Sequence, residues 1–316
     1  MLSLLSLYLW YGTLVSGGWM LLARTNWIFD LLIHFTMQYV FVALLAACLL
    51  MLQRSYVRAA IAVFCAALAF FVTVHGNGFV GAVWSASPTS QELIVLQANV
   101  NMGNKNPDAL AARIFKERPD ILTLNEVPPA WLSALKEKTG DWFAYSLEAT
   151  HDSYRGMAIL SRLPLDNGRV IPFSDEESPL LQAEIRGYDL SIYAIHTLSP
   201  VSAHWSALRD AQIAALGRLV SEDTHARIVV SGDFNSSVQS PALQSFFNET
   251  KLGDSRLLFR WQPTWMAGTP LAVAIDHVLF KGDLRSAGFT VLDPIGSDHR
   301  PVVARLIVMD NSRIGE

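Results

Sequence analysis

Residues 1–91 form an N-terminal segment that is almost free of charge, and no other feature constrains the fold of this chain as much. The whole chain has 24 Lys+Arg and 28 Asp+Glu. Only four of these lie in the segment: Arg24, Asp30, Arg54 and Arg58. A helix needs about 20 mainly apolar residues to cross the hydrocarbon core of a bilayer. The uncharged windows are long enough for this and predict three transmembrane helices, near 3–23, 31–52 and 58–76.

A cleaved signal peptide followed by buried core helices is the alternative for this segment. A signal peptide begins with a basic region, but no Lys or Arg precedes the first apolar run. Arg54 and Arg58 lie between the second and third predicted helices, and positively charged loops tend to stay in the cytoplasm. We therefore expect an integral protein of the inner or plasma membrane, with everything after residue 76 outside the cytoplasm. A transporter or channel is not favoured, because His34 is the one ionisable residue well inside a predicted span.

The rest of the chain predicts a linker, a globular domain and a short tail. We divide the sequence into an anchor (1–76), a linker rich in Gly, Ser, Asn and Pro (77–91), a globular domain (92–308) and a tail (309–316). In the globular domain apolar runs predict strands at 93–98, 121–124, 157–160, 190–195, 228–230, 272–280, 289–292 and 302–308. Helices are predicted to begin near 106–108 and to span 203–221. Two cysteines, both inside predicted spans, provide no disulfide framework.

Polar residues that suit phosphate chemistry follow several of these predicted strands. Glu126, Asp233 and Asp298 offer carboxylate oxygens, the ligands that Mg²⁺ prefers. His196 and His299 can move protons near neutral pH. Asp276 is a candidate partner that orients one of these imidazoles. Carboxylates, amides and a His–Asp pair fit the metal-assisted attack of water on a phosphoryl centre.

Five motifs at the ends of predicted strands resemble the endonuclease/exonuclease/phosphatase superfamily, the DNase I-like hydrolases. The motifs occur along the chain in the order found in that family. The most specific are Ser231-Gly-Asp233-Phe-Asn235 and Ser297-Asp298-His299-Arg-Pro301. The resemblance covers about residues 92–308. It implies a four-layer α/β/β/α sandwich of two mixed sheets, preceded here by the three membrane helices. It also implies a Mg²⁺ or Mn²⁺ cofactor and cleavage of a phosphodiester or phosphomonoester.

The resemblance also implies a role for each residue that matches a motif. Glu126 resembles the main metal ligand, with Asn99 beside it and Asp298 as a second acidic contact. Asp233 and Asn235 resemble the pair that positions the attacking water and the phosphate oxygens. His299 resembles the base or electrostatic partner, with Asp276 orienting it, and His196 resembles the group that stabilises the transition state or leaving group. We expect Asn99, Asn235 and Arg155 to bind substrate. His277 is expected to be a structural residue.

The substrate class stays open at this stage. The N-terminal segment carries a net +2 within a chain total of −4, so the globular domain carries −6. Non-specific nucleic-acid binding depends on basic patches, and no Lys/Arg run is present. We therefore expect a membrane-anchored, divalent-metal-dependent hydrolase of phosphate esters, acting on a phospholipid head group or a nucleic acid, with the lipid bilayer as its other partner and no protein partner indicated. The alternatives are a metal-dependent nuclease and a non-catalytic binding module of the same fold.

Overall fold

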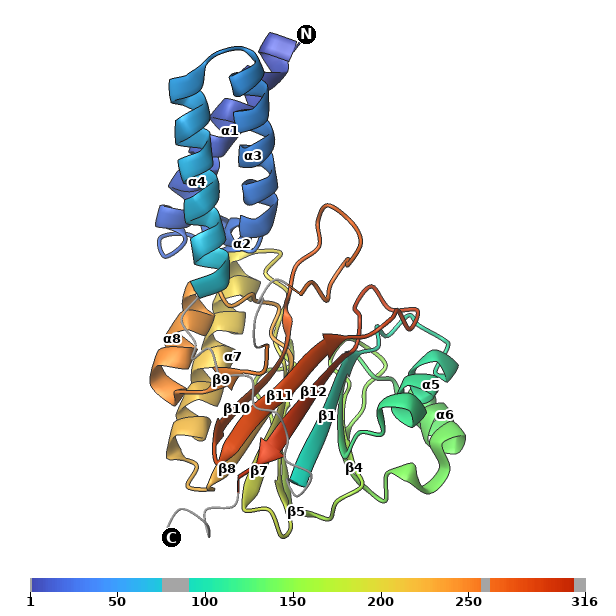
Figure 1. Ribbon diagram of the computed structural model, residues 1–316. Helices are drawn as coiled ribbons and strands as arrows, with labels where there is room; N and C mark the ends of the chain where they lie inside the picture. Colours follow the sequence, from blue (N-terminus) through green and yellow to red (C-terminus); the bar gives the residue numbers. More distant parts are fainter. Residues whose placement is uncertain (1, 76–90, 257–261, 310–316) are drawn as a thin grey trace.

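Two six-stranded mixed β-sheets packed face to face form the centre of the C-terminal part of the chain (Figure 1). The computed structural model describes residues 2–75, 91–256 and 262–309. The first sheet has the order β11-β12-β1-β2-β4-β3, with bounds β1 (Gln91–Asn99), β2 (Ile121–Asn125), β3 (Tyr145–Ala149), β4 (Met157–Ser161), β11 (Leu284–Val291) and β12 (Val302–Val308). The second has the order β5-β6-β7-β8-β10-β9, with bounds β5 (Leu165–Ile171), β6 (Leu180–Ile185), β7 (Leu190–His196), β8 (Arg227–Asp233), β9 (Gly253–Asp254) and β10 (Asp276–Gly282).

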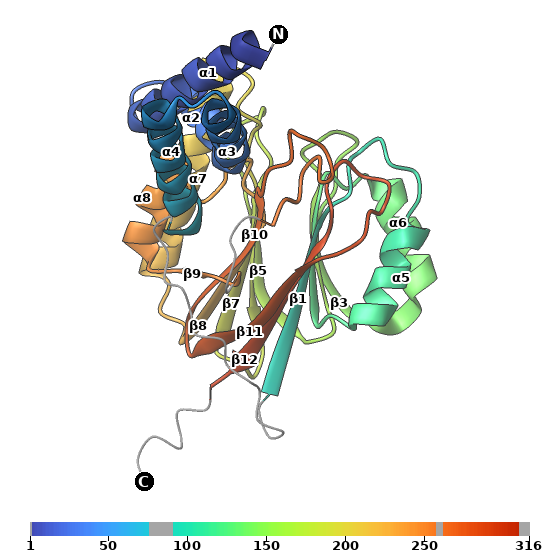
Figure 2. The same cartoon turned by 45° about the horizontal axis from the view of Figure 1, so that its top comes forward.

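Helices cover the outer face of each sheet (Figure 2). The first sheet carries α5 (Asp108–Glu117) and α6 (Pro129–Thr139), followed by the short 3₁₀ turn η1 (Gly140–Trp142), and the second carries α7 (Ala203–Glu222) and α8 (Pro241–Thr250). Successive side chains of a strand point to opposite faces, so Val95 packs between the sheets and Leu96 packs under α5 and α6. The predicted four-layer α/β/β/α sandwich is confirmed.

The strands that carry the predicted site residues end at one edge of the sandwich. β1 and β2 are parallel neighbours with Asn99 opposite Asn125, and β7 and β8 are parallel neighbours with His196 opposite Asp233. β10 runs antiparallel to β8 and begins at Asp276, opposite Asp233. Polar side chains from two separate sheets are therefore brought to the same edge, on a frame whose strands are buried on both faces.

Differences from the predicted elements have local causes. The strand predicted over 272–280 begins only at Asp276, because the Thr264 hydroxyl accepts hydrogen bonds from the N–H groups of Ile275 and Asp276. Sequence periodicity did not predict β3, β5, β6, α6 or α8. β3 and β5 are edge strands with mostly exposed or half-exposed residues, so they carry no clear alternation of apolar and polar side chains.

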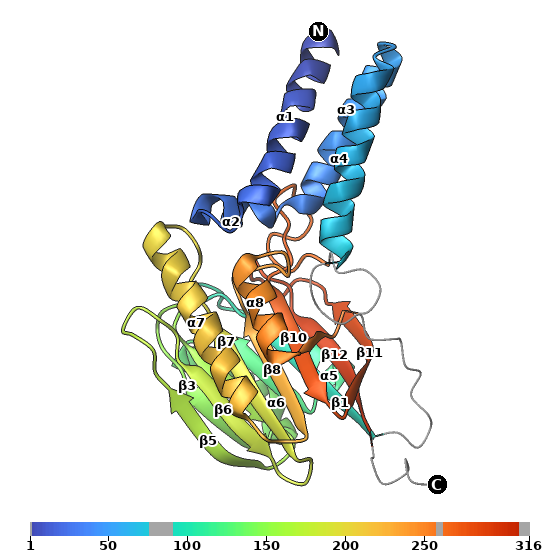
Figure 3. The ribbon, with the colours of Figure 1, turned by 90° about the vertical axis from the view of Figure 1, so that its left-hand side faces the viewer.

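The N-terminal segment folds into helices that project from one end of the sandwich (Figure 3). They are α1 (Leu2–Leu22), α2 (Trp27–Ile33), α3 (Thr36–Leu52) and α4 (Tyr56–His75). The second predicted helix, 31–52, is not continuous, because α2 and α3 meet at a bend of 68°. The bend lies at His34 and Phe35, next to the sandwich.

Length and hydropathy single out part of this segment as able to cross a membrane. Among the described residues, Tyr56–Thr73 of α4 qualifies alone, with a mean hydropathy of 2.0, and the bent pair of α2 and α3 qualifies if counted as one span. The third predicted span therefore meets the criteria by itself, although its apolar core is short. α1 is not among the qualifying helices.

Small side chains lie inside the helical bundle and large apolar ones lie outside. Ala46, Ala47 and Ala62 are buried between the helices, whereas Leu52 and Phe64 are 80% and 68% exposed. Only 28% of the qualifying window in α4 is buried. A helix from the core of a soluble protein shows the opposite arrangement, while small residues at the contacts are typical of helices packed in lipid.

Some predicted segments lie outside the described residues. They are the linker 77–91 and the tail 309–316, apart from one residue of each, and residues 259–261 of an aromatic stretch.

Candidate active site

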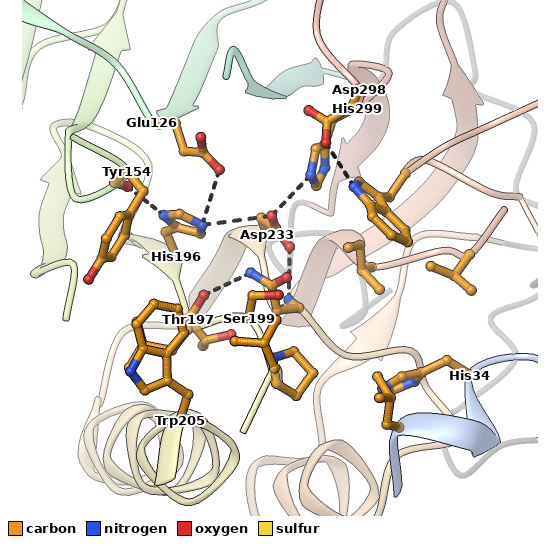
Figure 4. A pocket seen from close by; sticks show the side chains of 18 of the residues that line it. His34, Glu126, Tyr154, His196, Thr197, Ser199, Trp205, Asp233, Asp298 and His299 are labelled. Atoms are coloured by element: carbon orange, nitrogen blue, oxygen red, sulfur yellow. Dashed lines mark hydrogen bonds and ion pairs between the residues drawn. The ribbon is translucent and has the colours of Figure 1, made fainter. Parts of the chain in front are cut away.

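A cavity of about 460 Å³ opens at the edge where these strands end (Figure 4). This volume is typical of small-molecule sites, which range over about 300–1,000 Å³. Six of the residues predicted from the sequence line it: Glu126, His196, Asp233, Asn235, Asp298 and His299. Asn99 and Asp276 lie behind this set and hold members of it by hydrogen bonds.

Asp233 lies at the centre of the site, at the end of β8, and is 1% exposed. Its Oδ2 accepts a hydrogen bond from Asn99 Nδ2 at 3.0 Å, and its Oδ1 accepts one from the backbone N–H of Asn235 at 2.8 Å. Nε2 of His299 and Nε2 of His196 lie 3.6 and 3.8 Å from Oδ2. Burial raises the pKa of Asp233, against the opposing influence of the two imidazoles. A nearby positive charge therefore stabilises its charged form.

His299 is oriented by Asp276. Its Nδ1 lies 2.9 Å from Asp276 Oδ2, so this nitrogen donates to the carboxylate and Nε2 faces Asp233. Although burial opposes the charged imidazolium, Asp276 and Asp233 raise the pKa of His299 to about 10. The imidazole is thus held in one orientation and stabilised in its protonated form.

His196 approaches Asp233 from the other side of the cavity. Its Nδ1 lies 3.0 Å from the carbonyl oxygen of Tyr154, which can only accept a hydrogen bond, so Nδ1 carries a proton. Its Nε2 lies 3.8 Å from both Asp233 Oδ2 and Glu126 Oε1. Two imidazoles, each fixed through Nδ1, therefore direct Nε2 toward one buried carboxylate, as Figure 4 shows.

The acidic oxygens of the site fit a hard divalent cation. Glu126 and Asp298 line the cavity together with Asp233, and no cysteine is among the lining residues. Such an all-oxygen set suits Mg²⁺ or Mn²⁺. Asp298 is held by Asn101 Nδ2 at 2.8 Å and by Trp265 Nε1 at 2.9 Å. These bonds outweigh the effect of burial and lower the pKa of Asp298, which keeps it anionic.

The sequence predicted Glu126, Asn99 and Asp298 as metal ligands. Other residues of the site could also offer ligand atoms. Asn99 presents its Nδ2 to Glu126 at 2.9 Å, while its Oδ1 accepts the backbone N–H of Asn101 at 3.0 Å. In the described part of the chain, one group of three residues brings its potential ligand atoms within 4.8 Å of one another: Asp233, Asp276 and His299. Of these, only Asp233 and His299 line the cavity.

Two buried amides beneath the site, Gln97 and Asn125, lie within the sequence motifs but were assigned no role from the sequence. Asn125 Oδ1 accepts hydrogen bonds from Gln97 Nε2 and from the backbone N–H of Asp233, both at 3.0 Å. Gln97 Nε2 also lies 3.0 Å from Asp276 Oδ1. These amides tie β1 and β2 of the first sheet to β8 and β10 of the second. A signal was present, because Gln97 and Asn99 are polar residues two apart in an otherwise apolar strand and thus share a face.

Arg155 lies beside the cavity and is not among its lining residues. Its guanidinium donates to the Asp175 carbonyl oxygen, and Nη2 lies 3.0 Å from His151 Nε2. The neighbouring Tyr154 does line the cavity. Trp265 also lines it. His277 is buried in the domain, with Nε2 2.9 Å from the Ser236 carbonyl oxygen.

The backbone around the site is strained. Asn101, Glu126, Asn235 and Met266 have φ of +57°, +55°, +44° and +46°. Each such conformation costs a non-glycine residue about 1–3 kcal/mol and tends to occur at functional sites. Here it turns the Glu126 side chain away from the direction that the end of β2 would give it and toward His196.

Gly232 allows β8 to approach β7 next to Asp233. Its φ is +155°, and a Cβ at this position would lie 1.9 Å from the Ile195 carbonyl oxygen. We expect Gly232→Ala to lower the free energy of unfolding by about 1–3 kcal/mol and to displace Asp233, so that activity falls as well. Gly288→Ala, which meets nothing within 4 Å, is the matched control in thermal unfolding. Equal unfolding temperatures for the two variants would contradict this reading of Gly232.

Fold and site together define a class of protein, the α/β/β/α sandwich with acidic residues and histidines gathered at one edge of its two sheets. The chain belongs to the endonuclease/exonuclease/phosphatase family, whose family model matches residues 96–299. No curated protein matches the sequence at a significant level.

Several solved structures share the sandwich. A zebrafish (D. rerio) TDP2 in complex with a single-strand DNA product is 16% identical, with a TM-score of 0.59, and covers 68% of this chain and 99% of its own. An endonuclease/exonuclease/phosphatase from Beutenbergia cavernae is 22% identical, with a TM-score of 0.56 and coverage of 69% and 72%. A mannosyl-6-phosphatase from Bacteroides thetaiotaomicron is 15% identical, with a TM-score of 0.55 and coverage of 68% and 99%. At these identities the likeness concerns the fold alone.

Proposed function

We propose that the protein is a membrane-anchored, divalent-metal-dependent hydrolase of phosphate esters. The observation that carries this proposal is the pair of imidazoles that direct Nε2 toward the buried Asp233, one of them held by Asp276, at the base of a cavity that also holds Glu126 and Asp298. Hydrolysis of a phosphate ester needs a held water, stabilised phosphoryl oxygens and a protonated leaving group.

Each of these tasks has a side chain in the cavity. Asp233, with its raised pKa, orients and deprotonates the attacking water, and Asn235 Nδ2, 2.8 Å from the Thr197 carbonyl oxygen, is fixed beside it. The charged His299 stabilises negative charge on the phosphoryl oxygens. His196 lies on the other side of Asp233 and is placed to protonate the leaving group. A divalent cation held by Glu126 and Asp298 would neutralise phosphate charge and polarise the phosphorus–oxygen bonds.

The membrane part of the proposal rests on the helical bundle. A monomeric soluble protein rarely exposes apolar patches above a few hundred Å², yet α1, α3 and α4 carry many exposed large apolar side chains. The N-terminal end of α1 and the α3–α4 loop lie together at the far end of the bundle, linked by Ser6 and Gln53 at 2.9 Å. Arg54 and Arg58 are at that end, so a cytoplasmic position for them puts the sandwich outside the cytoplasm.

The test is a substrate panel on the full chain in non-ionic detergent. The panel contains bis(4-nitrophenyl) phosphate, DNA, RNA, sphingomyelin and a phosphoinositide. We expect hydrolysis of at least one phosphate ester with Mg²⁺ or Mn²⁺, loss of it on chelation with EDTA, and its return when the metal is added back. Asp233→Ala and His299→Ala should each lower kcat by about 10²–10⁴.

One outcome of this panel would count against the proposal: wild type that hydrolyses nothing with any divalent metal would favour the non-catalytic binding module. DNA or RNA as the one good substrate would leave the hydrolase proposal standing and would assign the protein to the nucleases. A reporter fused after residue 90 tests the topology separately, and a cytoplasmic readout would contradict the orientation.

A further inference from the structure

The cavity that holds the catalytic groups is closed on one side by the N-terminal helices. Leu31, His34 and Phe35, from the corner between α2 and α3, line it together with Glu126 and His299 of the sandwich. Figure 4 places His34 on the N-terminal ribbon, at the side of the cavity away from Glu126. The anchor is thus part of the wall of the site, and its contribution is mainly apolar.

The part of the cavity wall that the sandwich contributes near this corner is also apolar. It comes from the loop after β7 and the start of α7, through Leu198, Val201 and Trp205. The Val201 residue is 67% exposed, and Ile28 on α2 is 47% exposed. An apolar compartment therefore adjoins the catalytic groups, and part of its lining comes from the corner between α2 and α3. The helices project from the sandwich at this corner (Figure 3).

Contacts with the sandwich hold this corner in place. Asp30 of α2 forms a buried ion pair with Arg209 of α7. His34 Nδ1 lies 2.8 Å from Ser237 Oγ, on the loop that follows Asp233 and Asn235. Gln38 Nε2 donates to the Ala272 carbonyl oxygen at 2.7 Å. A wall fixed by an ion pair and hydrogen bonds at three separate points has a defined shape.

One polar atom of this compartment has no partner in the described part of the chain. The backbone N–H of Ser237 donates to His34 Nδ1 at 3.3 Å, so Nδ1 accepts and the proton lies on Nε2. That Nε2 is buried and makes no hydrogen bond, and the His34 side chain lines the cavity at 6% exposure. A buried N–H without a partner is unfavourable, and a ligand oxygen that accepts from it would remove this cost.

The charge of the residues that line the cavity disfavours a ligand with many negative charges. Within the part of the chain that the structure describes, the lining residues include Glu126, Asp233 and Asp298 and neither Lys nor Arg. Nucleic-acid backbones are bound by Lys and Arg that replace counterions. A ligand with one phosphate ester and a long apolar part matches both ends of this cavity.

We propose that the corner between α2 and α3, with Leu198, Val201 and Trp205, is an apolar subsite that binds the hydrocarbon part of an amphiphilic phosphate ester. His34 Nε2 donates to an oxygen of that molecule between its phosphate and its chain. This inference rests on the proposed hydrolase activity and adds the substrate class. The substrate enters from the bilayer side with its phosphate reaching Asp233 and its chain remaining between the anchor and the sandwich.

A series of 4-nitrophenyl alkyl phosphate diesters tests this inference, because the leaving group is constant and only the alkyl chain grows from methyl to dodecyl. The full chain is assayed with Mg²⁺ at a fixed concentration of non-ionic detergent. We expect kcat/KM to rise by up to about fourfold for each methylene that enters the subsite. Alkyl phosphates of the same lengths, used as inhibitors, should show the same trend in the inhibition constant.

Variants separate the subsite from partition of the longer esters into micelles. Phe35→Ala, and Val201→Asn on the exposed loop as a second variant with less risk to folding, should lower the ratio of kcat/KM for dodecyl over methyl by about tenfold or more. Phe115→Ala, a half-exposed residue of α5, should leave this ratio unchanged. Metal-dependent hydrolysis with equal kcat/KM across the series, or an unchanged ratio in both subsite variants, would overturn this inference alone. No hydrolysis by wild type of any diester of this series or of any ester of the substrate panel would overturn the proposed hydrolase activity with it.

Discussion

Replacing Asp276 with Asn is expected to lower kcat for phosphate-ester hydrolysis by about 10³–10⁴, the range seen when the carboxylate that orients a catalytic histidine becomes an amide. Asp276 is fully buried and lies 2.9 Å from His299 Nδ1. An amide at this position can present its NH₂ group to Nδ1, which would move the imidazole proton to Nε2. It also removes the charge that helps to raise the pKa of His299.

Steady-state kinetics with bis(4-nitrophenyl) phosphate is the measurement for this substitution. We expect kcat to fall much more than KM rises, because Asp276 does not line the cavity. Asp293→Asn is the matched control: its carboxylate is 70% exposed and pairs with Arg113 on the surface, and its activity should equal that of wild type. An Asp276→Asn variant that keeps its fold and more than a tenth of the wild-type kcat would contradict the assigned role.

The sequence was most informative where polar residues end apolar strands. Asp233 and His299 could be identified because their two motifs occur together in one chain; Gly, Asp and Asn alone also favour a plain turn. The register of the strands then brings these motifs together, and that register was implied only by the family resemblance. Gln97 and Asn125 were missed because their role depends on a contact between two sheets, which no spacing along one strand reveals.

The N-terminal segment shows the limit of composition as a guide. A low charge density predicted helices near 3–23, 31–52 and 58–76, and helices occur there. Composition did not predict the bend at His34, a residue that contacts Ser237, more than 200 residues away in sequence. Composition equally could not indicate that Leu31 and Phe35 share a cavity with His299, because that depends on contacts between distant parts of the chain.

The ion pair between Asp30 and Arg209 leads to the second large effect, on stability. Arg209 is fully buried and Asp30 is 6% exposed. We expect Arg209→Met to lower the free energy of unfolding by about 3–5 kcal/mol, because it leaves the Asp30 carboxylate buried without its partner. Thermal unfolding of the full chain in non-ionic detergent measures this loss. Arg218→Met, an exposed position on the same helix, should leave the unfolding temperature within error of wild type.

Removing both charges should reverse most of that loss, since a buried ion pair can often be replaced by apolar residues of similar volume at little cost. We therefore expect the double variant Asp30→Leu, Arg209→Met to be more stable than Arg209→Met alone, although it has one more substitution. Asp30→Leu alone should be the milder single change, because Arg209 keeps Asp210 at 2.7 Å and that carboxylate is half exposed. Losses that simply add in the double variant would mean that the two side chains do not interact energetically, and that the anchor is held on the sandwich by its other contacts.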